Sequence, residues 1–186
     1  VVYNGINDGF KPLADEEKRV TKEKFAQGKS YFLFVGSQSP RKNLNRLIAA
    51  FDLFKQQTQS DFKLVLVGAV YCSDGDVKKV IDKSNFKHDI LFVGRQPQEE
   101  LENIMAAAFA LTFVPYFEGF GIPMVEAMQC ETPIICSNTT SMPEIAGNAA
   151  ILVNPFEVNE ISKAMVNLYQ NENTRQQLIL NGIQRK

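Results

Sequence analysis

Two glutamates, Glu118 and Glu126, enclose the stretch of this sequence whose residue types most favour chemistry. Gly119 and Gly121 lie between them, and a backbone without a Cβ can turn tightly and approach a ligand closely. A helix predicted to begin near Phe120 or Gly121 would present unpaired N–H groups and a positive dipole end, which favour an anion such as phosphate. Glu126 would lie roughly 7 Å along that helix, at a distance suited to accepting hydrogen bonds from a ribose diol. Glu118 would lie beside a sugar attached to the phosphate, whereas a glycine-rich turn with two solvated acids is the simpler alternative.

A second loop supplies positive charge. It runs from Gly36 to Arg41, Lys42 and Asn43, after an apolar run that reads as a strand. Arginine can hold phosphate oxygens bidentately, lysine acts as a point charge, and Asn43 is a plausible N-cap of the next helix. Taken alone, the pair is equally compatible with a solvated basic helix start. The loop around Arg95, after a later strand, would border the same crevice and could contact a nucleobase through backbone groups, or simply lead into a helix.

These loops need a sheet that brings them to one edge. Continuous apolar runs such as Tyr31–Gly36 alternate with segments of helical apolar spacing, and this pattern is typical of a parallel sheet covered on both faces. We therefore predict an α/β fold, a doubly wound Rossmann-like parallel sheet of about six strands with ligands bound at the carboxyl ends of its strands. The polar segment 11–29 is predicted to be a solvated lead-in helix. The predicted strands are 31–36, 62–67, 90–94, 111–114, 133–136 and 150–153, and helices are predicted over 44–54, 76–82, 97–108, from about 120 onward, over 161–169 and up to about 182.

Composition excludes several classes of protein. The 186 residues carry 20 Lys and Arg against 21 Asp and Glu, a net charge of −1, which gives no reason to expect a nucleic-acid partner. Neither a run long enough to span a bilayer nor a signal peptide is visible. Three cysteines, Cys72, Cys130 and Cys136, lack metal spacing and indicate unpaired thiols in a reducing, cytoplasmic compartment. The one histidine, His88, reads as a surface residue, so a Ser-His-Asp enzyme is disfavoured.

Two further patterns do not lead to a predicted site. Asp74 and Asp76 form an Asp-x-Asp that could hold a divalent metal, but they lie in a turn-prone stretch, and no metal site is predicted. The first predicted strand is not followed by Gly-x-Gly-x-x-Gly, which argues against a classical NAD-binding fold.

The run from Glu118 to Glu126 matches the Glu-x7-Glu motif of retaining glycosyltransferases of the GT-B fold, in its Gly-Phe-Gly-Ile-Pro form. The sequence thus resembles the C-terminal, nucleotide-sugar-binding domain of a family-four, group 1 transferase over nearly its whole length. Other segments that resemble the family are Asn4–Asn7, Gly36 with Arg41–Leu44, Glu126–Met128, Thr132–Ile135 and Met142–Gly147.

The resemblance implies a role for each matching residue. Arg41 and Lys42 would neutralise the donor diphosphate and Glu118 would lie at the transferred sugar. Backbone groups of Gly119–Ile122 would bind the phosphate or sugar hydroxyls, and Glu126 would bind the ribose. It implies a GDP- or UDP-linked donor, no metal and no cofactor. The Pro-Arg-Lys-Asn form resembles mannosyl- and rhamnosyl-type transferases.

The resemblance also implies that residues 1–186 are one donor-binding domain of a longer enzyme. A glycan or lipid-linked acceptor would bind to an N-terminal domain that this chain does not include, and the full-length enzyme could associate peripherally with a membrane. Two departures stand out: Ser37 replaces an arginine common after the first strand, which Arg41 could supply, and Glu131 replaces a glycine at a turn where a left-handed backbone would be mildly strained. A nucleotide-binding module without transfer activity is the main alternative, ahead of a GT-B phosphorylase or a transferase with a metal at Asp74 and Asp76.

Overall fold

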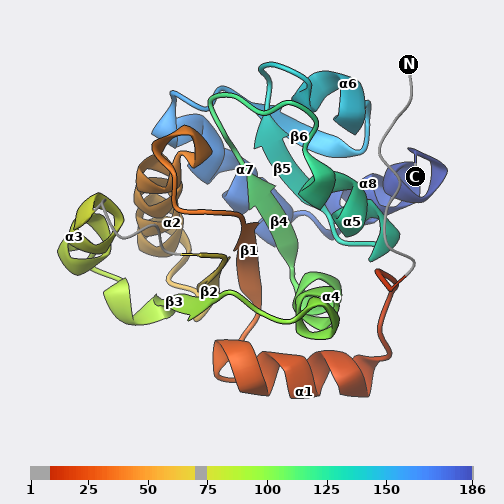
Figure 1. Ribbon diagram of the computed structural model, residues 1–186, viewed down its shortest axis with the longest axis horizontal. Helices are drawn as coiled ribbons and strands as arrows, with labels where there is room; N and C mark the ends of the chain where they lie inside the picture. Colours follow the sequence, from red (N-terminus) through yellow and green to blue (C-terminus); the bar gives the residue numbers. More distant parts are fainter. Residues whose placement is uncertain (1–8, 70–74, 186) are drawn as a thin grey trace.

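A computed structural model describes residues 9–69 and 75–185, with the side chains of residues 75 and 76 also left undescribed. Six parallel strands form one sheet in the order β3-β2-β1-β4-β5-β6 (Figure 1). The strands are β1 (Tyr31–Val35), β2 (Lys63–Val67), β3 (Ile90–Gly94), β4 (Ala110–Phe113), β5 (Ile134–Ser137) and β6 (Ala150–Val153). The predicted doubly wound parallel sheet is confirmed, with each strand within one residue of its expected bounds.

Helices cover both faces of the sheet. They are α1 (Asp15–Ala26), α2 (Leu44–Thr58), α3 (Gly75–Lys83), α4 (Gln98–Ala107), α5 (Ile122–Gln129), α6 (Met142–Ala146), α7 (Val158–Gln170) and α8 (Glu172–Arg185), with short 3-10 helices η1 (Pro40–Lys42) and η2 (Lys87–Asp89). Figure 1 shows α4 and α5 on one side of the central strands and α2 on the other. Within the described residues, no helix combines the length and apolar character needed to cross a bilayer.

Two hydrophobic cores, one on each face, hold these layers together. Side chains alternate along β1, so Leu33 packs with Ile104 and Met124 while Phe32 packs with Phe51 and residues of α7 on the opposite face. Because parallel strands are buried on both faces, their sequences are continuously apolar. These apolar runs were enough to predict the strands.

The segment 11–29 differs from its prediction. Helix α1 is not a solvated lead-in, because Thr21, Phe25 and Ala26 are buried and the helix packs on α4. An ion pair between Lys24 and Glu100, with Nζ and Oε1 2.5 Å apart, joins the two helices. The polar residues of α1 form its outer face. The prediction of a solvated helix did not account for the narrow buried face around Phe25.

Other expectations have mixed outcomes. His88 is exposed in η2, as predicted. Cys130 and Cys136 are buried thiols, and burial raises the pKa of Cys136 to about 12. The segment Asn4–Asn7, Cys72 and Asp74 lie outside the described residues.

Candidate active site

The strand order reverses between β1 and β4, and the loops that follow these strands meet at the carboxyl edge of the sheet. One loop carries Arg41 and Lys42 in η1, and the other carries Glu118 just before α5. The backbone N–H of Tyr116 donates to the carbonyl oxygen of Arg41 at 2.9 Å, which fixes the two loops against each other. The sequence placed both loops at this edge, and the structure confirms that placement.

Both cations bind the same carboxylate oxygen. Arg41 Nη1 lies 2.7 Å from Glu118 Oε2, and Lys42 Nζ donates to the same atom. The side chains of Lys42 and Glu118 are 10% and 18% exposed, whereas that of Arg41 is 49% exposed. Burial alone would raise the pKa of Glu118, but the hydrogen bonds and charges of Lys42 and Arg41 outweigh it and hold the pKa below its ordinary value. Glu118 is therefore an ionised, part-buried member of a three-residue cluster.

The Lys42 side chain is also held by an aromatic ring. Its ammonium lies 4.8 Å from the ring centroid of Phe113, the last residue of β4, in a cation–π arrangement. Arg41 has no such ring contact among the described ones and instead donates to the backbone oxygen of Phe117 at 3.3 Å. Lys42 is thus anchored on the sheet, and Arg41 reaches along the loop surface.

Asn43 joins three loops of this edge. It is the N-cap residue of α2, as predicted, but its φ of 62° is left-handed and its side chain makes no capping hydrogen bond. Its Nδ2 donates instead to the carbonyl oxygens of Val114, at 2.9 Å, and Pro155, at 2.7 Å. The loops after β1, β4 and β6 therefore share one buried amide, a role that a capping pattern does not reveal.

The turn before α5 combines fixed and open positions. Gly121 has φ 90°, a conformation that residues with a side chain rarely adopt. A Cβ there would also lie 2.7 Å from Met142 Cε, which is closer than van der Waals contact allows. A Cβ on Gly119 would meet no atom within 4 Å, which leaves open space beside that backbone. Phe120 packs half-buried against the core, and Ile122 is exposed. Ser141 supports the turn by donating from Oγ to the carbonyl oxygen of Glu118 at 3.0 Å, a contact that the sequence did not indicate.

Glu126 has surroundings unlike those of Glu118. It is half-buried on α5, and burial together with the nearby charge of Glu102 raises its pKa to about 7. Glu102 belongs to α4, where its Oε1 accepts a hydrogen bond from Gln98 Nε2 at 3.0 Å. The contacts recorded for the described residues do not join Glu126 to the cations.

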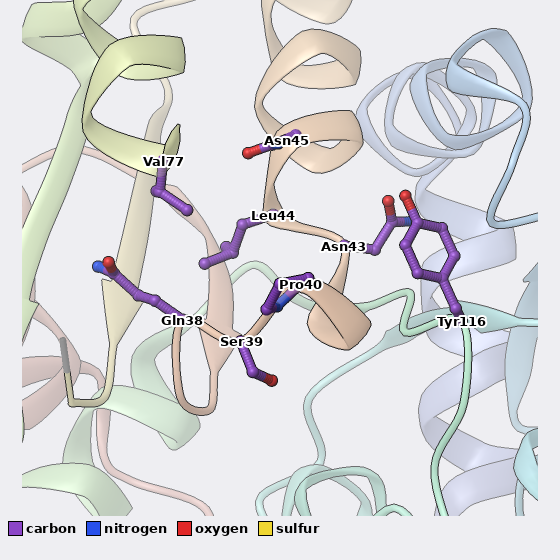
Figure 2. Close-up of a pocket in the computed structure, with 8 residues that line it drawn as sticks. All are labelled: Gln38, Ser39, Pro40, Asn43, Leu44, Asn45, Val77 and Tyr116. Carbon is purple, nitrogen blue, oxygen red and sulfur yellow. The ribbon is translucent and has the colours of Figure 1, made fainter. Parts of the chain in front are cut away.

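Two cavities open at this edge. A cleft of about 750 Å³ lies across the carboxyl ends of β1, β2 and β3 and brings together Gly36, Ser37 and Arg95. A smaller pocket of about 140 Å³ lies between the β1 loop and the first turns of α2 and α3, and its lining includes Ser39, Asn43 and Tyr116 (Figure 2). None of the residues predicted for the site lines this smaller pocket.

An aromatic cluster borders the site on the side of β6. Tyr116 and Phe156 stack with ring centroids 5.0 Å apart, and the guanidinium of Arg46 lies 5.4 Å and 5.9 Å from the two centroids. Phe156 and Phe117 are exposed. The sequence gives no signal for this cluster, because its members come from three separate segments.

The remaining expectations concern charge and strain. The described part of the chain contains no group of three or more His, Cys, Asp or Glu side chains able to hold a metal ion, while Asp74 and the side chain of Asp76 lie outside that part. Ser37, which stands where an arginine is common in the resembling family, lines the cleft of about 750 Å³. Arg41 places a guanidinium 2.7 Å from Glu118 Oε2 in the neighbouring loop. Glu131 has φ 58°, so the left-handed turn expected there is confirmed.

Comparisons with known proteins agree with this geometry. A family model described as glycosyl transferases group 1 matches residues 15–185. The O-antigen chain mannosyltransferase B of Escherichia coli is 32% identical over 153 residues, covering 82% of this chain and 40% of that protein. The O-antigen chain mannosyltransferase RfbU of Salmonella typhimurium is 31% identical over 177 residues, covering 91% of this chain and 44% of that protein. The chain therefore spans less than half the length of these relatives.

A solved structure shares the fold. The HepE protein of Anabaena, in complex with UDP, superimposes with a TM-score of 0.87 at 20% identity, covering 99% of this chain and 52% of that one. At this level of identity the likeness shows the fold alone.

Proposed function

Because the chain belongs to the group 1 glycosyl transferases, we propose that it is the donor-binding domain of a longer enzyme. That enzyme would transfer a hexosyl group, of mannosyl type, from a nucleoside-diphosphate sugar to an acceptor sugar or lipid-linked glycan, with retention of configuration. The observation that carries the proposal is the convergence of Arg41 and Lys42 on Glu118 at the point where the strand order reverses. The mannosyl assignment is supported by the two O-antigen mannosyltransferases among its relatives.

The two cations would act on the leaving group. Negative charge grows on the nucleoside diphosphate as the glycosidic bond breaks, and cations held beside it stabilise the transition state more than the ground state. Lys42 is suited to this because its ammonium is part-buried and fixed against Phe113, so little reorganisation is needed. Arg41 would add bidentate hydrogen bonds to phosphate oxygens. The cations and the start of α5 would do this work without a metal or a cofactor.

The remaining donor groups would bind along the same edge. Backbone N–H groups of Gly119–Ile122 would bind phosphate or sugar hydroxyls, since the space beside Gly119 is open. The cleft containing Gly36 and Arg95 is large enough for a nucleobase of a GDP- or UDP-linked donor. Glu126 would bind the ribose, and with a pKa of about 7 it is part-ionised at neutral pH. The acceptor would bind to an N-terminal domain, and the enzyme would act in the cytoplasm with peripheral membrane contact.

Calorimetric titration of the chain with GDP, UDP, ADP and their sugars tests the first part of the proposal. A ligand present at about 100 times its dissociation constant should also stabilise the fold by about 2.7 kcal/mol in thermal unfolding. Lys42→Met should abolish or strongly weaken binding, while Lys87→Met, an exposed lysine in η2 at the opposite edge of the sheet, should leave it unchanged. Failure of every nucleotide to bind at high concentration would contradict the proposal.

Transfer itself requires the full-length enzyme. Glu118→Gln should abolish mannosyl transfer there, measured with radiolabelled donor and acceptor. If the unmutated full-length protein bound nucleotide but transferred no sugar, the alternative of a nucleotide-binding module without transfer activity would be the better description. Transfer that continued unchanged in Glu118→Gln would contradict the catalytic role of Glu118.

A further inference from the structure

The cations assigned to the donor diphosphate already share one carboxylate of the chain itself. A single carboxylate oxygen, Glu118 Oε2, accepts hydrogen bonds from both Arg41 and Lys42. Phosphate oxygens would compete for those same N–H donors. A diphosphate and the ionised Glu118 side chain cannot both take the present position of Oε2, and their like charges repel at such short range.

The local structure allows the carboxylate to move while its backbone stays in place. The backbone oxygen of Glu118 accepts a hydrogen bond from Ser141 Oγ at 3.0 Å. The next residue, Gly119, borders open space, since a Cβ added there would meet no atom within 4 Å apart from its two chain neighbours. Lys42 is buried and held by Phe113, so it stays, whereas the half-exposed Arg41 can follow either anion.

From this geometry we propose, on the basis of the function proposed above, that Glu118 is an internal anion that competes with the diphosphate and thereby discriminates between donor and product. Either ligand must displace the carboxylate from Arg41 and Lys42. A nucleotide sugar compensates for the displacement, because the released carboxylate can accept hydrogen bonds from hydroxyls of the transferred sugar. A nucleoside diphosphate has no sugar at that position, so nothing offsets the free energy needed to displace the carboxylate. The diphosphate therefore dissociates more readily after transfer.

The size of the effect follows from the population of the closed arrangement. If the carboxylate holds the cations in about nine tenths of free molecules, the apparent affinity for a nucleoside diphosphate is reduced about tenfold. Removing the charge of Glu118 should restore that factor for the diphosphate. It should give a smaller gain, or a loss, for the nucleotide sugar, because the contact with the sugar is removed as well.

Calorimetric titration of the 186-residue chain and of Glu118→Gln with GDP and GDP-mannose, and with UDP and UDP-glucose, tests this. We expect the dissociation constant for the nucleoside diphosphate to fall about tenfold in Glu118→Gln, and the preference for the nucleotide sugar to shrink. Glu23→Gln removes one charge from an exposed position on α1 and should change neither constant. Unchanged or weaker binding of the diphosphate by Glu118→Gln would overturn the inference.

A measurement on the unmutated chain removes any dependence on how the variant folds. Carboxyl-carbon NMR should show a low pKa for Glu118 in the free chain, where Arg41 and Lys42 face it, and a higher pKa when GDP or UDP is bound. A Glu118 pKa that stays low with the diphosphate bound would overturn the inference.

The two proposals fail in distinguishable ways. If neither the unmutated chain nor Glu118→Gln binds any nucleotide, the donor-binding function falls and the competition by Glu118 falls with it. If the unmutated chain binds a nucleotide, Lys42→Met abolishes that binding and Glu118→Gln does not tighten it, the donor-binding function stands and only the internal anion is disproved.

Discussion

Opposite edges of the sheet carry two clusters with the same charges, each with two cations around one carboxylate. At the carboxyl edge Arg41 and Lys42 bind Glu118. At the amino edge Lys55 Nζ lies 2.7 Å from Asp89 Oδ2, and Lys63 Nζ lies 2.6 Å from Asp89 Oδ1. We call these the carboxyl-edge cluster and the amino-edge cluster.

The two clusters differ in how completely their groups are bound by the protein. In the amino-edge cluster both lysines are buried, with side chains 4% and 11% exposed. Lys55 also donates to the backbone oxygens of Ser60 and Phe62. In the carboxyl-edge cluster Arg41 is half-exposed and open space lies beside Gly119. Charge composition therefore does not distinguish a structural ion cluster from a binding site, whereas the remaining exposure of the cations and the space around them does.

The largest effect should come from Asp89→Asn. Removing this charge leaves Lys55 and Lys63 buried without the carboxylate that both bind, which should lower the free energy of unfolding by about 3 kcal/mol. Urea denaturation measures this, and Glu16→Gln, which removes an exposed pair with Arg19, should leave it nearly unchanged. Nucleotide affinity should be unchanged; a tenfold change would erase the distinction between the clusters.

The same variant tests the pH dependence. Burial would raise the pKa of Asp89, but the hydrogen bonds and charges of Lys55 and Lys63 hold it below its ordinary value. A lowered folded pKa contributes stability above the unfolded pKa, near 4 as a rough value, and this contribution is lost as the pH falls through the folded pKa. Acidification from pH 5 to about 3 should therefore destabilise the unmutated chain more than Asp89→Asn.

Lys42→Met should have the opposite profile. Its Nζ donates a charge-assisted hydrogen bond at the proposed phosphate site, so its loss should weaken nucleotide binding about thirtyfold, or ~2 kcal/mol. The free energy of unfolding should change less, because methionine fills a similar volume against Phe113. Titration calorimetry and urea denaturation of one preparation give both quantities, and a large loss of stability with intact binding would assign this cluster a structural role too.

Glu126 extends the comparison of the two clusters to an acid whose pKa is shifted by burial and another acid and not by a cation. Because burial and Glu102 raise its folded pKa to about 7, its charge destabilises the fold at high pH, and this penalty disappears as the pH falls toward the unfolded pKa. Allowing for its partial exposure, Glu126→Gln should stabilise the chain by about 1 kcal/mol at pH 8 and leave it unchanged near pH 4.5. Equal stability of the two proteins at pH 8 would show that Glu126 is not perturbed.

The smallest stability effect should come from Glu118→Gln. Water can replace the lost carboxylate at the half-exposed Arg41, and the buried Lys42 keeps its cation–π contact with Phe113, so the free energy of unfolding should fall by less than about 1 kcal/mol. Thermal unfolding without ligand measures this. A loss comparable to that of Asp89→Asn would place both clusters in the same structural class.

The sequence allowed the meeting of the loops after β1 and β4 to be predicted, because parallel strands end at one edge, but it did not indicate that Arg41 and Lys42 would pair with Glu118. The amino-edge cluster was not foreseen, since it depends on how the end of α2 packs beside the starts of β2 and β3. Asn43 was correctly placed at the helix start, but its hydrogen bonds depend on loops far away in sequence. The contact of Ser141 with the turn was also not predicted. Its partner is a backbone oxygen far away in sequence, and such a contact leaves no sequence pattern.

The hydrogen bonds of Asn43 have a consequence for engineering the loops at this edge of the sheet. Its amide donates only to backbone oxygens, those of residues 114 and 155, so the side chains of the two receiving loops are not constrained by it. Loops from relatives could therefore be exchanged at these two positions with their own sequences, provided that Asn43 is kept and the grafts preserve the loop length up to each accepting carbonyl.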